Sequence, residues 1–203
     1  MDSITQFVLG AGIGEAVLGK KIGNKAPILG AIVGTIPDLD VLLVPFFSEL
    51  QKISIHRGYS HSILFCLLGA FLFAYLFRKW KWTREVKYPK LWFFSFLALF
   101  THVLLDAFTS FGTQLFLPFT DWRVSFDSIG IIDPVYTIPL LLGVLGSIYF
   151  DKPNDQKRGF LNRVGLIVSA LYLMFTLANK QHVAEVFSTQ LEEEGTSYFR
   201  MLT

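Results

Sequence analysis

Apolar residues are concentrated in six segments of this 203-residue chain, and short polar loops separate them. We place the segments at residues 4–18, 26–47, 60–77, 91–110, 131–150 and 161–180. Most of them approach the roughly 20 residues that an α-helix needs to cross about 30 Å of hydrocarbon. The pattern therefore predicts an all-α protein, a polytopic transmembrane helical bundle with about five to six membrane segments.

The first two segments are less regular than the others. The segment 4–18 contains Glu15 and three glycines, and the segment 26–47 contains Pro37 and Pro45. Irregular backbone is tolerated at membrane depth where protein or a water-filled cavity covers it. We therefore expect one or two of these segments to be broken or re-entrant.

The composition supports a membrane location. Hydrophobic residues make up 52% of the chain and charged residues 17%, against about 25% charged residues in soluble domains. The net charge of +2 provides no basic face for a nucleic-acid backbone, so we expect the lipid bilayer and no nucleic acid as a partner. Cys66 is the single cysteine, which excludes an intrachain disulfide and a cysteine-based metal site.

The distribution of lysine and arginine predicts the orientation. Thirteen of the 18 basic residues lie in or beside the first, third and fifth loops. Because basic loops are retained on the cytoplasmic side, the intervening loops 48–59 and 111–130 should face outward. We expect a multi-pass protein of the cell (inner, cytoplasmic) membrane.

Ionisable residues inside the apolar segments cost about 2.5–3.5 kcal/mol each near the centre of a spanning helix, so they require a partner or a function. His102 and Asp106 are four residues apart and share one helix face, where they could reach one ion. A structural pair between helices would have the same spacing.

Asp38 and Asp40 would point about 200° apart on a regular helix, but a break at Pro37 could bring them together. Alternatively, they are a helix cap and a first-turn acid.

Two histidines and an arginine precede the third segment. We place His56 in the loop and His61 in the first helical turn, with Ser60 or Ser62 as the helix cap. Arg57 offers a bidentate fork to a phosphate or a carboxylate, or it pairs with one of the nearby carboxylates.

The loop charges place these residues at one depth, in the outer half of the membrane. We therefore predict a metal site facing the extracytoplasmic side, with six ligands: Asp38, Asp40, His56, His61, His102 and Asp106. Histidine and carboxylate ligands suit Zn²⁺, the ion we favour, and also Mn²⁺ or Fe²⁺, so ligand softness does not decide the ion. Six ligands exceed the needs of one zinc ion, so we expect one or two ions.

Such a site lowers the pKa of a bound water toward about 7, which favours hydrolysis. We predict a membrane-embedded, metal-dependent hydrolase acting on a phosphoester or lipid-linked substrate. The predicted catalytic residues are Asp38, His56, Arg57 and His61. A divalent-metal transporter and a non-enzymatic membrane scaffold with a structural metal site are the alternatives.

Two weaker candidates lie in or after the loop 111–130. Arg123 could neutralise charge on a substrate, and Asp133 precedes Pro134, as a helix N-cap would. Asp121 and Asp127 are interpreted as ordinary loop acids. His182, at the end of the last segment, is interpreted as an interfacial residue without a functional role.

At these residues the chain resembles a family of bacterial and archaeal inner-membrane proteins. The family is classed as a domain of unknown function, and its members are described as metal-dependent hydrolases. The matching pieces are Met1-Asp2-Ser3-Ile4-Thr5-Gln6, Ile36-Pro37-Asp38-Leu39-Asp40, His56-Arg57-Gly58-Tyr59-Ser60-His61-Ser62, His102-Val103-Leu104-Leu105-Asp106 with Thr109, Gly112-Thr113 and Ile132-Asp133-Pro134. The resemblance implies a multi-span fold and a metal site made of the six ligands named above. Many members carry a histidine where this chain has Gln6, so the resemblance assigns no ligand to the first segment.

We assign residues 1–182 to a transmembrane catalytic domain and residues 183–203 to a polar tail. The tail is interpreted as a solvated helix and linker, or as the start of a soluble domain that continues further.

Overall fold

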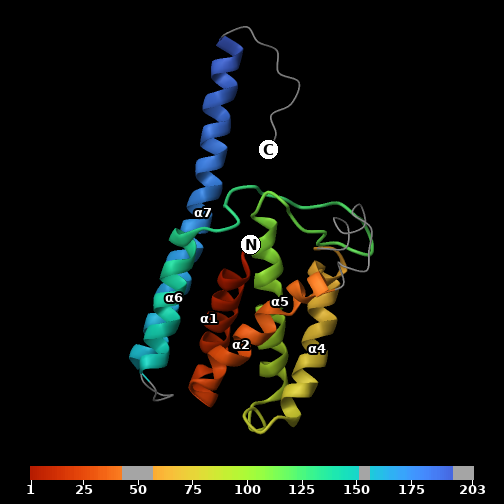
Figure 1. Ribbon diagram of the computed structural model, residues 1–203, viewed down its shortest axis with the longest axis vertical. Coiled ribbons are helices and arrows are strands. Elements are labelled where there is room, and N and C mark those ends of the chain that lie inside the picture. Colours follow the sequence, from red (N-terminus) through yellow and green to blue (C-terminus); the bar gives the residue numbers. More distant parts are fainter. Residues whose placement is uncertain (43–56, 151–155, 194–203) are drawn as a thin grey trace.

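The computed structural model describes residues 1–42, 57–150 and 156–193, and within these ranges the regular structure is helical (Figure 1). An isolated antiparallel bridge between Thr113 and Val124 is the one β-type pairing in the described part. The helices, including the two short 3₁₀ turns η1 and η3, are α1 (Ser3–Ile22), α2 (Lys25–Thr35), η1 (Pro37–Leu42), η3 (Tyr59–His61), α4 (Ile63–Lys79), α5 (Tyr88–Ala107), α6 (Pro134–Tyr149) and α7 (Gln156–Glu193). The all-α prediction is confirmed.

The predicted segment 26–47 is not one helix. Helix α2 ends at Thr35, and Pro37 opens the 3₁₀ turn η1; residues 43–47 lie outside the described ranges. A proline clashes with the carbonyl of the preceding turn, which explains the break. The break leaves Asp38 on a short turn at the end of the bundle, where the geometry differs from that of an α-helix.

Two other boundaries differ from the sequence-based expectation. His61 lies in η3 before α4 rather than in its first turn, because Ser62 is the N-cap that accepts from the Phe65 amide. The last helix is longer than the predicted segment 161–180. Helix α7 has 38 residues and continues to Glu193, well beyond the end of the bundle (Figure 1).

Helices α1 and α2 form a tightly packed hairpin. A Cβ atom added to Gly30 would lie 2.1 Å from the carbonyl oxygen of Gly10, and one added to Gly14 would lie 2.2 Å from that of Ala26. Small residues of this kind let two membrane helices approach until their backbones touch. The glycines made the first segment look irregular in the sequence. In the structure they allow the close contact that positions α2 and the η1 turn that follows it.

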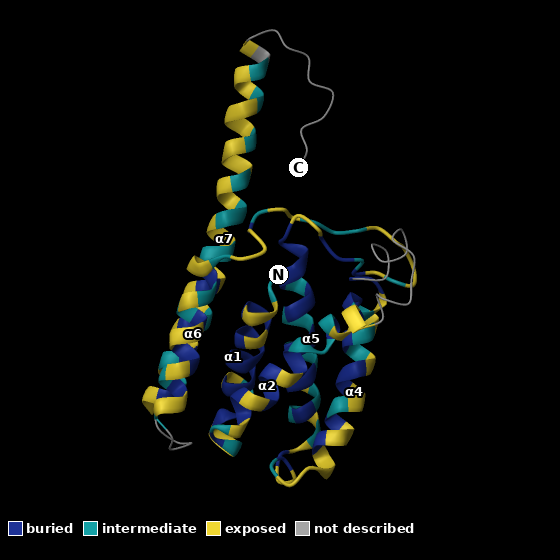
Figure 2. Ribbon diagram, viewed as in Figure 1, coloured by how far each residue is buried: buried dark blue, intermediate teal, exposed yellow. Residues whose placement is uncertain are grey.

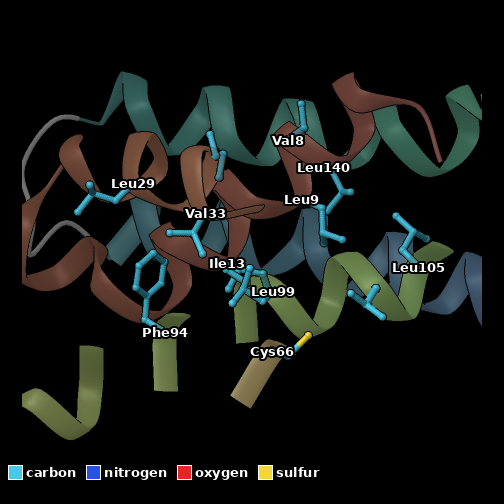
Figure 3. Packing of buried hydrophobic residues seen from close by; sticks show 14 of the residues in the cluster. Val8, Leu9, Ile13, Leu29, Val33, Cys66, Phe94, Leu99, Leu105 and Leu140 are labelled. Atoms are coloured by element: carbon cyan, nitrogen blue, oxygen red, sulfur yellow. The ribbon is translucent and has the colours of Figure 1, made fainter. Parts of the chain in front are cut away.

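Helices α1 and α5 form the centre of the bundle, and their buried side chains contrast with the exposed ones of α7 (Figure 2). Figure 3 shows Leu9 and Ile13 of α1 packed with Val33 of α2 and Leu99 of α5. This core fixes the end of α5 that carries His102 against the ends of α1 and α2.

A buried ion pair joins α7 to α1. Arg158 donates from Nε to Glu15 Oε1 at 2.6 Å, and from a second nitrogen to Glu15 Oε2. It also donates to Asn24 Oδ1 at 2.6 Å. Both charged side chains are almost fully buried, so each one compensates the buried charge of the other.

Large apolar side chains are exposed along the outer helices. On α4, Leu68 and Phe71 are 61% and 53% exposed, and on α7, Leu171 and Phe175 are 64% and 63% exposed. Two helices, α5 and α7, are long and apolar enough to cross a membrane, and α2 and α6 are shorter apolar helices. Lipid is the solvent that such faces require.

Candidate metal centre

Four acidic and histidine side chains converge at one end of the bundle, where α2 and α5 end and α4 begins. Asp38 lies on η1 after α2, and His61 ends η3 just before α4. His102 and Asp106 lie on successive turns near the end of α5. One ligand atom from each of the four lies within 4.8 Å of all the others, so the group could hold a metal ion.

Five of the six distances among these atoms are close to the edges of a tetrahedron. His61 Nε2 lies 3.3 Å from His102 Nε2, 3.6 Å from Asp38 Oδ1 and 3.2 Å from Asp106 Oδ2. His102 Nε2 lies 3.4 Å from Asp38 Oδ1 and 3.7 Å from Asp106 Oδ2. Zinc bonds of about 2.0–2.1 Å in tetrahedral geometry require ligand-to-ligand edges of about 3.3 Å. The two histidines and Asp106 therefore stand at spacings close to those of three zinc ligands.

His102 is oriented by a backbone carbonyl. Its Nδ1 lies 2.6 Å from the carbonyl oxygen of Gly34, which can only accept, so Nδ1 carries the hydrogen. In the neutral ring, Nε2 then has a free lone pair directed into the cluster. A hydrogen bond from the other ring nitrogen is the usual support of a metal-binding histidine.

His61 has the same arrangement with side-chain partners. Its Nδ1 lies 2.9 Å from Ser60 Oγ, and Ser60 Oγ donates to Asp40 Oδ2 at 2.6 Å. Because the serine hydrogen is committed to Asp40, Nδ1 of His61 must donate to Ser60. Nε2 of the neutral ring therefore directs its lone pair into the cluster, as in His102.

Asp106 is fully buried and its two oxygens have different surroundings. Oδ1 accepts from Gln6 Nε2 at 3.1 Å and from the amino group of Met1. Oδ2, which points to the two histidines, has no hydrogen-bond partner in the described structure. An unsatisfied buried carboxylate oxygen is costly, and a cation at the centre of the cluster would satisfy it.

The cluster attracts positive charge. Asp38 Oδ1 lies 3.6 Å and Asp106 Oδ2 lies 3.2 Å from His61 Nε2, and both carboxylates are at most partly exposed. These carboxylates therefore draw either a proton or a metal ion to the same point.

Asp40 and His56, the other two predicted ligands, are not in this group of four. Asp40 is 8% exposed and stands behind His61, where Oδ2 accepts from the Arg57 amide at 3.1 Å and lies 3.5 Å from His61 Nδ1. It supports His61 rather than facing the other ligands. His56 lies outside the described residues.

The two predicted arginines lie close together beside the cluster. Arg57, at a positive φ of 64°, donates to Thr109 Oγ1 at 3.0 Å, and its Nε lies 3.7 Å from Asp106 Oδ2. Its guanidinium also covers the ring of Phe111, whose carbonyl accepts from Arg123 at 3.2 Å. Burial and then the positive charge of Arg57 lower the pKa of Arg123. Two neighbouring cations here favour a negatively charged ligand.

The remaining acidic and histidine candidates lie elsewhere. Asp133 caps α6, with Oδ1 accepting from two amides of its first turn and Oδ2 from Tyr172. This weaker candidate is therefore a structural cap and not a member of the four-residue cluster. Asp121 and His182 are exposed, and Asp127 is 3.7 Å from Lys180.

Several site residues were not identified from the sequence. Gln6 supports Asp106, Ser60 connects His61 to Asp40, and Thr109 binds Arg57. A buried glutamine in an apolar segment was a usable signal for Gln6. Nothing local distinguished Ser60 from the neighbouring cap Ser62, because both are serines at the start of the same segment.

Comparison with known proteins places the chain among membrane proteins. A sequence model of the family described as YdjM inner membrane protein matches residues 1–183. The chain is 29% identical over 154 residues to the "Uncharacterized protein YfhP" of Bacillus subtilis (strain 168), covering 71% of this chain and 45% of that protein. It is 30% identical over 104 residues to the "Inner membrane protein YbcI" of Escherichia coli (strain K12), covering 51% of this chain and 56% of that protein. The chain thus spans about half the length of these relatives, and no solved structure matches it.

Proposed function

Because the chain belongs to the YdjM inner membrane protein family, we propose that it is a multi-pass membrane enzyme, a metal-dependent hydrolase of phosphoester or lipid-linked substrates. The observation that carries this proposal is the grouping of Asp38, His61, His102 and Asp106 within 4.8 Å of one another, with Arg57 beside it and Arg123 near Arg57. Zinc is the ion we favour because two histidine nitrogens and one carboxylate oxygen at these spacings suit it, and manganese or iron would also fit.

We assign the three most buried ligands to holding the ion. The side chains of His61 and Asp106 are fully buried and that of His102 is 1% exposed, whereas that of Asp38 is 20% exposed. Two histidines and one carboxylate are a common ligand set of catalytic zinc sites. The bound ion would lower the pKa of a water molecule toward about 7.

Asp38 then has a separate role. It is the one member of the cluster that solvent reaches, and its Oδ1 lies beside both histidine Nε2 atoms. In the proposed reaction, Asp38 orients the incoming water and accepts its proton, as a general base does. If Asp38 instead remains a fourth ligand, the site is closed and structural.

Arg57 and Arg123 support an anionic substrate. Arg57 is held by Thr109 and by its contact with Phe111, so its guanidinium is fixed beside the cluster. A planar guanidinium matches two oxygens of a phosphate group. We therefore assign these arginines to binding the substrate phosphate and stabilising charge that develops on it.

The proposed site faces the extracytoplasmic side at headgroup level. The ligands lie at the end of the bundle opposite the basic residues of the α1–α2 turn and of the loop between α4 and α5. Because basic loops are retained in the cytoplasm, the site end is proposed to be outside. The exposed apolar faces of α4, α6 and α7 support five to six membrane segments, with α2 and η1 as the broken one.

The position of the ligands also bears on the transporter alternative. Ion sites of secondary transporters lie near the bilayer midplane, where both sides of the membrane can be reached in turn. Here all four ligands lie at helix ends. This placement favours hydrolysis at one face.

The test is metal analysis combined with activity on a panel of phospholipids and phosphoesters, using the purified full chain. Asp38→Asn should keep most of the metal and lose hydrolysis, whereas Asp121→Asn, an exposed loop change, should keep both. Metal-loaded protein that is inactive on the whole panel would overturn the enzymatic proposal. Metal that is lost from Asp38→Asn would instead assign Asp38 to a closed structural site.

A further inference from the structure

A cavity of about 700 Å³ lies at the opposite end of the bundle from the metal centre. It is formed where the end of α1 and the start of α2 meet the loop between α4 and α5. Its lining residues are Lys21, Ile22, Lys25, Lys81, Trp82, Arg84, Glu85 and Val86. The volume is within the range of about 300–1,000 Å³ that is usual for small-molecule sites.

The charge of this cavity is unbalanced. Four of the lining residues are cations, Lys21, Lys25, Lys81 and Arg84, and one is an acid, Glu85. Across the described ranges, none of these four side chains forms an ion pair or donates a hydrogen bond to the protein. Lys25 instead lies over the ring of Trp82, 5.4 Å from its centroid. Four cations against one acid give the cavity a positive charge that would attract a ligand of negative charge.

The cavity also has an apolar wall. Val86 is buried, Ile22 is half-buried, and Trp82 stacks on Trp80 with ring centroids 5.2 Å apart. Tryptophan is enriched at the level of lipid headgroups, where one side of the ring is apolar and the other meets water. A ligand with a charged head and an apolar body would match both parts of this lining.

A second cavity, of about 430 Å³, continues the charged surface. It shares Arg84, Glu85 and Val86 with the first cavity and adds two further cations, Arg78 and Lys87. The two cavities therefore meet at Arg84, whose guanidinium can bind two phosphate oxygens at once.

We propose that the larger cavity binds a phosphate group, and that its source is the headgroup of an anionic phospholipid in the cytoplasmic leaflet. Basic pockets between membrane helices on the cytoplasmic side are suited to anionic headgroups. The apolar wall favours a lipid over a soluble phosphate, since a free phosphate ion gains nothing from Trp82 or Ile22. The inference requires that this end of the bundle lies at the cytoplasmic surface, but it does not require a metal or hydrolysis at the other end.

The experiment measures thermal stability of the full chain in neutral detergent, titrated in three arms with phosphatidylglycerol, phosphatidylcholine or inorganic phosphate. Phosphatidylglycerol should raise Tm in a saturable manner, and phosphatidylcholine should not. Equal shifts with the two lipids would overturn the inference. A full shift with inorganic phosphate alone would also overturn the assignment to a lipid.

A matched pair of double variants distinguishes lipid binding in this cavity from attraction by the basic surface as a whole. Lys21→Gln with Arg84→Gln removes two lining cations, and Lys20→Gln with Lys90→Gln removes two cations of the same end that do not line it. Since each basic residue near the surface contributes about 1 kcal/mol, the lining pair should weaken phosphatidylglycerol binding about tenfold or more. The control pair should retain it.

Equal weakening by both pairs would show diffuse charge attraction and contradict a built site. Helical content by circular dichroism checks that both variants fold. All four changes are on partly or fully exposed side chains, so both proteins should keep the helicity of the parent.

Discussion

The Nε2 atoms of His61 and His102 lie 3.3 Å apart, although each ring directs its Nδ1 toward an oxygen that accepts a hydrogen bond. In neutral rings, two lone pairs therefore face one another across a buried space. Asp38 Oδ1 and Asp106 Oδ2 add further negative charge to it. Such an arrangement is unfavourable unless a positive charge lies among the four atoms.

The first prediction concerns the ligands themselves. His102→Ala and Asp106→Asn should each weaken zinc binding by more than about 100-fold, the upper end of the effect of changes beside a metal site. Isothermal titration with zinc measures this. Asp121→Asn, on an exposed loop residue, should bind as the parent does, and unchanged metal content in both ligand variants would remove the central claim.

The second prediction separates Asp40 from the ligands. Asp40 contacts Ser60 and the Arg57 amide and lies 3.5 Å from His61 Nδ1. Asp40→Asn should therefore lower metal affinity by about 10–100-fold, because it loosens the orientation of His61 without removing a ligand. A loss as large as that of Asp106→Asn would show that Asp40 binds the ion directly.

The third prediction concerns removal of the metal. An ion that binds the folded protein stabilises it by about 2.7 kcal/mol at a concentration of 100 times Kd. A chelator should therefore lower Tm of the parent protein by several degrees. His102→Ala should start from the lower Tm and show no further response to the chelator; a response equal to that of the parent would indicate that the ion binds elsewhere.

The fourth prediction concerns the buried pair of Glu15 and Arg158. Removing one partner leaves a buried charge without compensation, so Glu15→Ala should destabilise the bundle by about 3–5 kcal/mol. The double variant Glu15→Ala with Arg158→Met should recover much of this loss. Unfolding in mixed micelles with increasing sodium dodecyl sulfate measures it, and an additive double variant would contradict the coupling.

The fifth prediction tests the contact between α1 and α2. Gly30→Ala places a Cβ atom 2.1 Å from the Gly10 carbonyl oxygen, so the two helices must separate and both stability and metal affinity should fall. Gly159→Ala is the control, because nothing lies within 4 Å of its added Cβ. It should be neutral or slightly stabilising, since alanine favours helix over glycine.

The sequence predicted much of the fold because helix length and apolar composition are local properties. The spacing of His102 and Asp106 likewise depends on one helix, and both residues are in the cluster. The membrane topology brought Asp38 and His61 to the same end, since alternate loops return to the same side. None of these three features of the chain depends on side-chain packing.

The distinction between Asp38 and Asp40 could not be predicted in the same way. Both lie on η1, where each residue turns the chain by about 120°, so a rotation of about 240° leaves carboxylates two residues apart pointing about 120° apart. A break at Pro37 was expected to bring them together, but a 3₁₀ turn separates them. The hydrogen bond from Gln6 to Asp106 depends on the packing of α1 on α5, which no local sequence pattern specifies.

The residues of the cluster come from three places in the order of synthesis: Asp38 after α2, His61 before α4, and His102 with Asp106 at the end of α5. A nascent chain that has inserted only its first hairpin therefore has Asp38 and none of the three residues assigned to hold the ion. High-affinity metal binding would begin only once α5 has entered the bilayer and packed against α1 and α2. Metal acquisition would then be a late step of biogenesis, and a chain whose α5 is misplaced would be distinguishable by its failure to retain the ion.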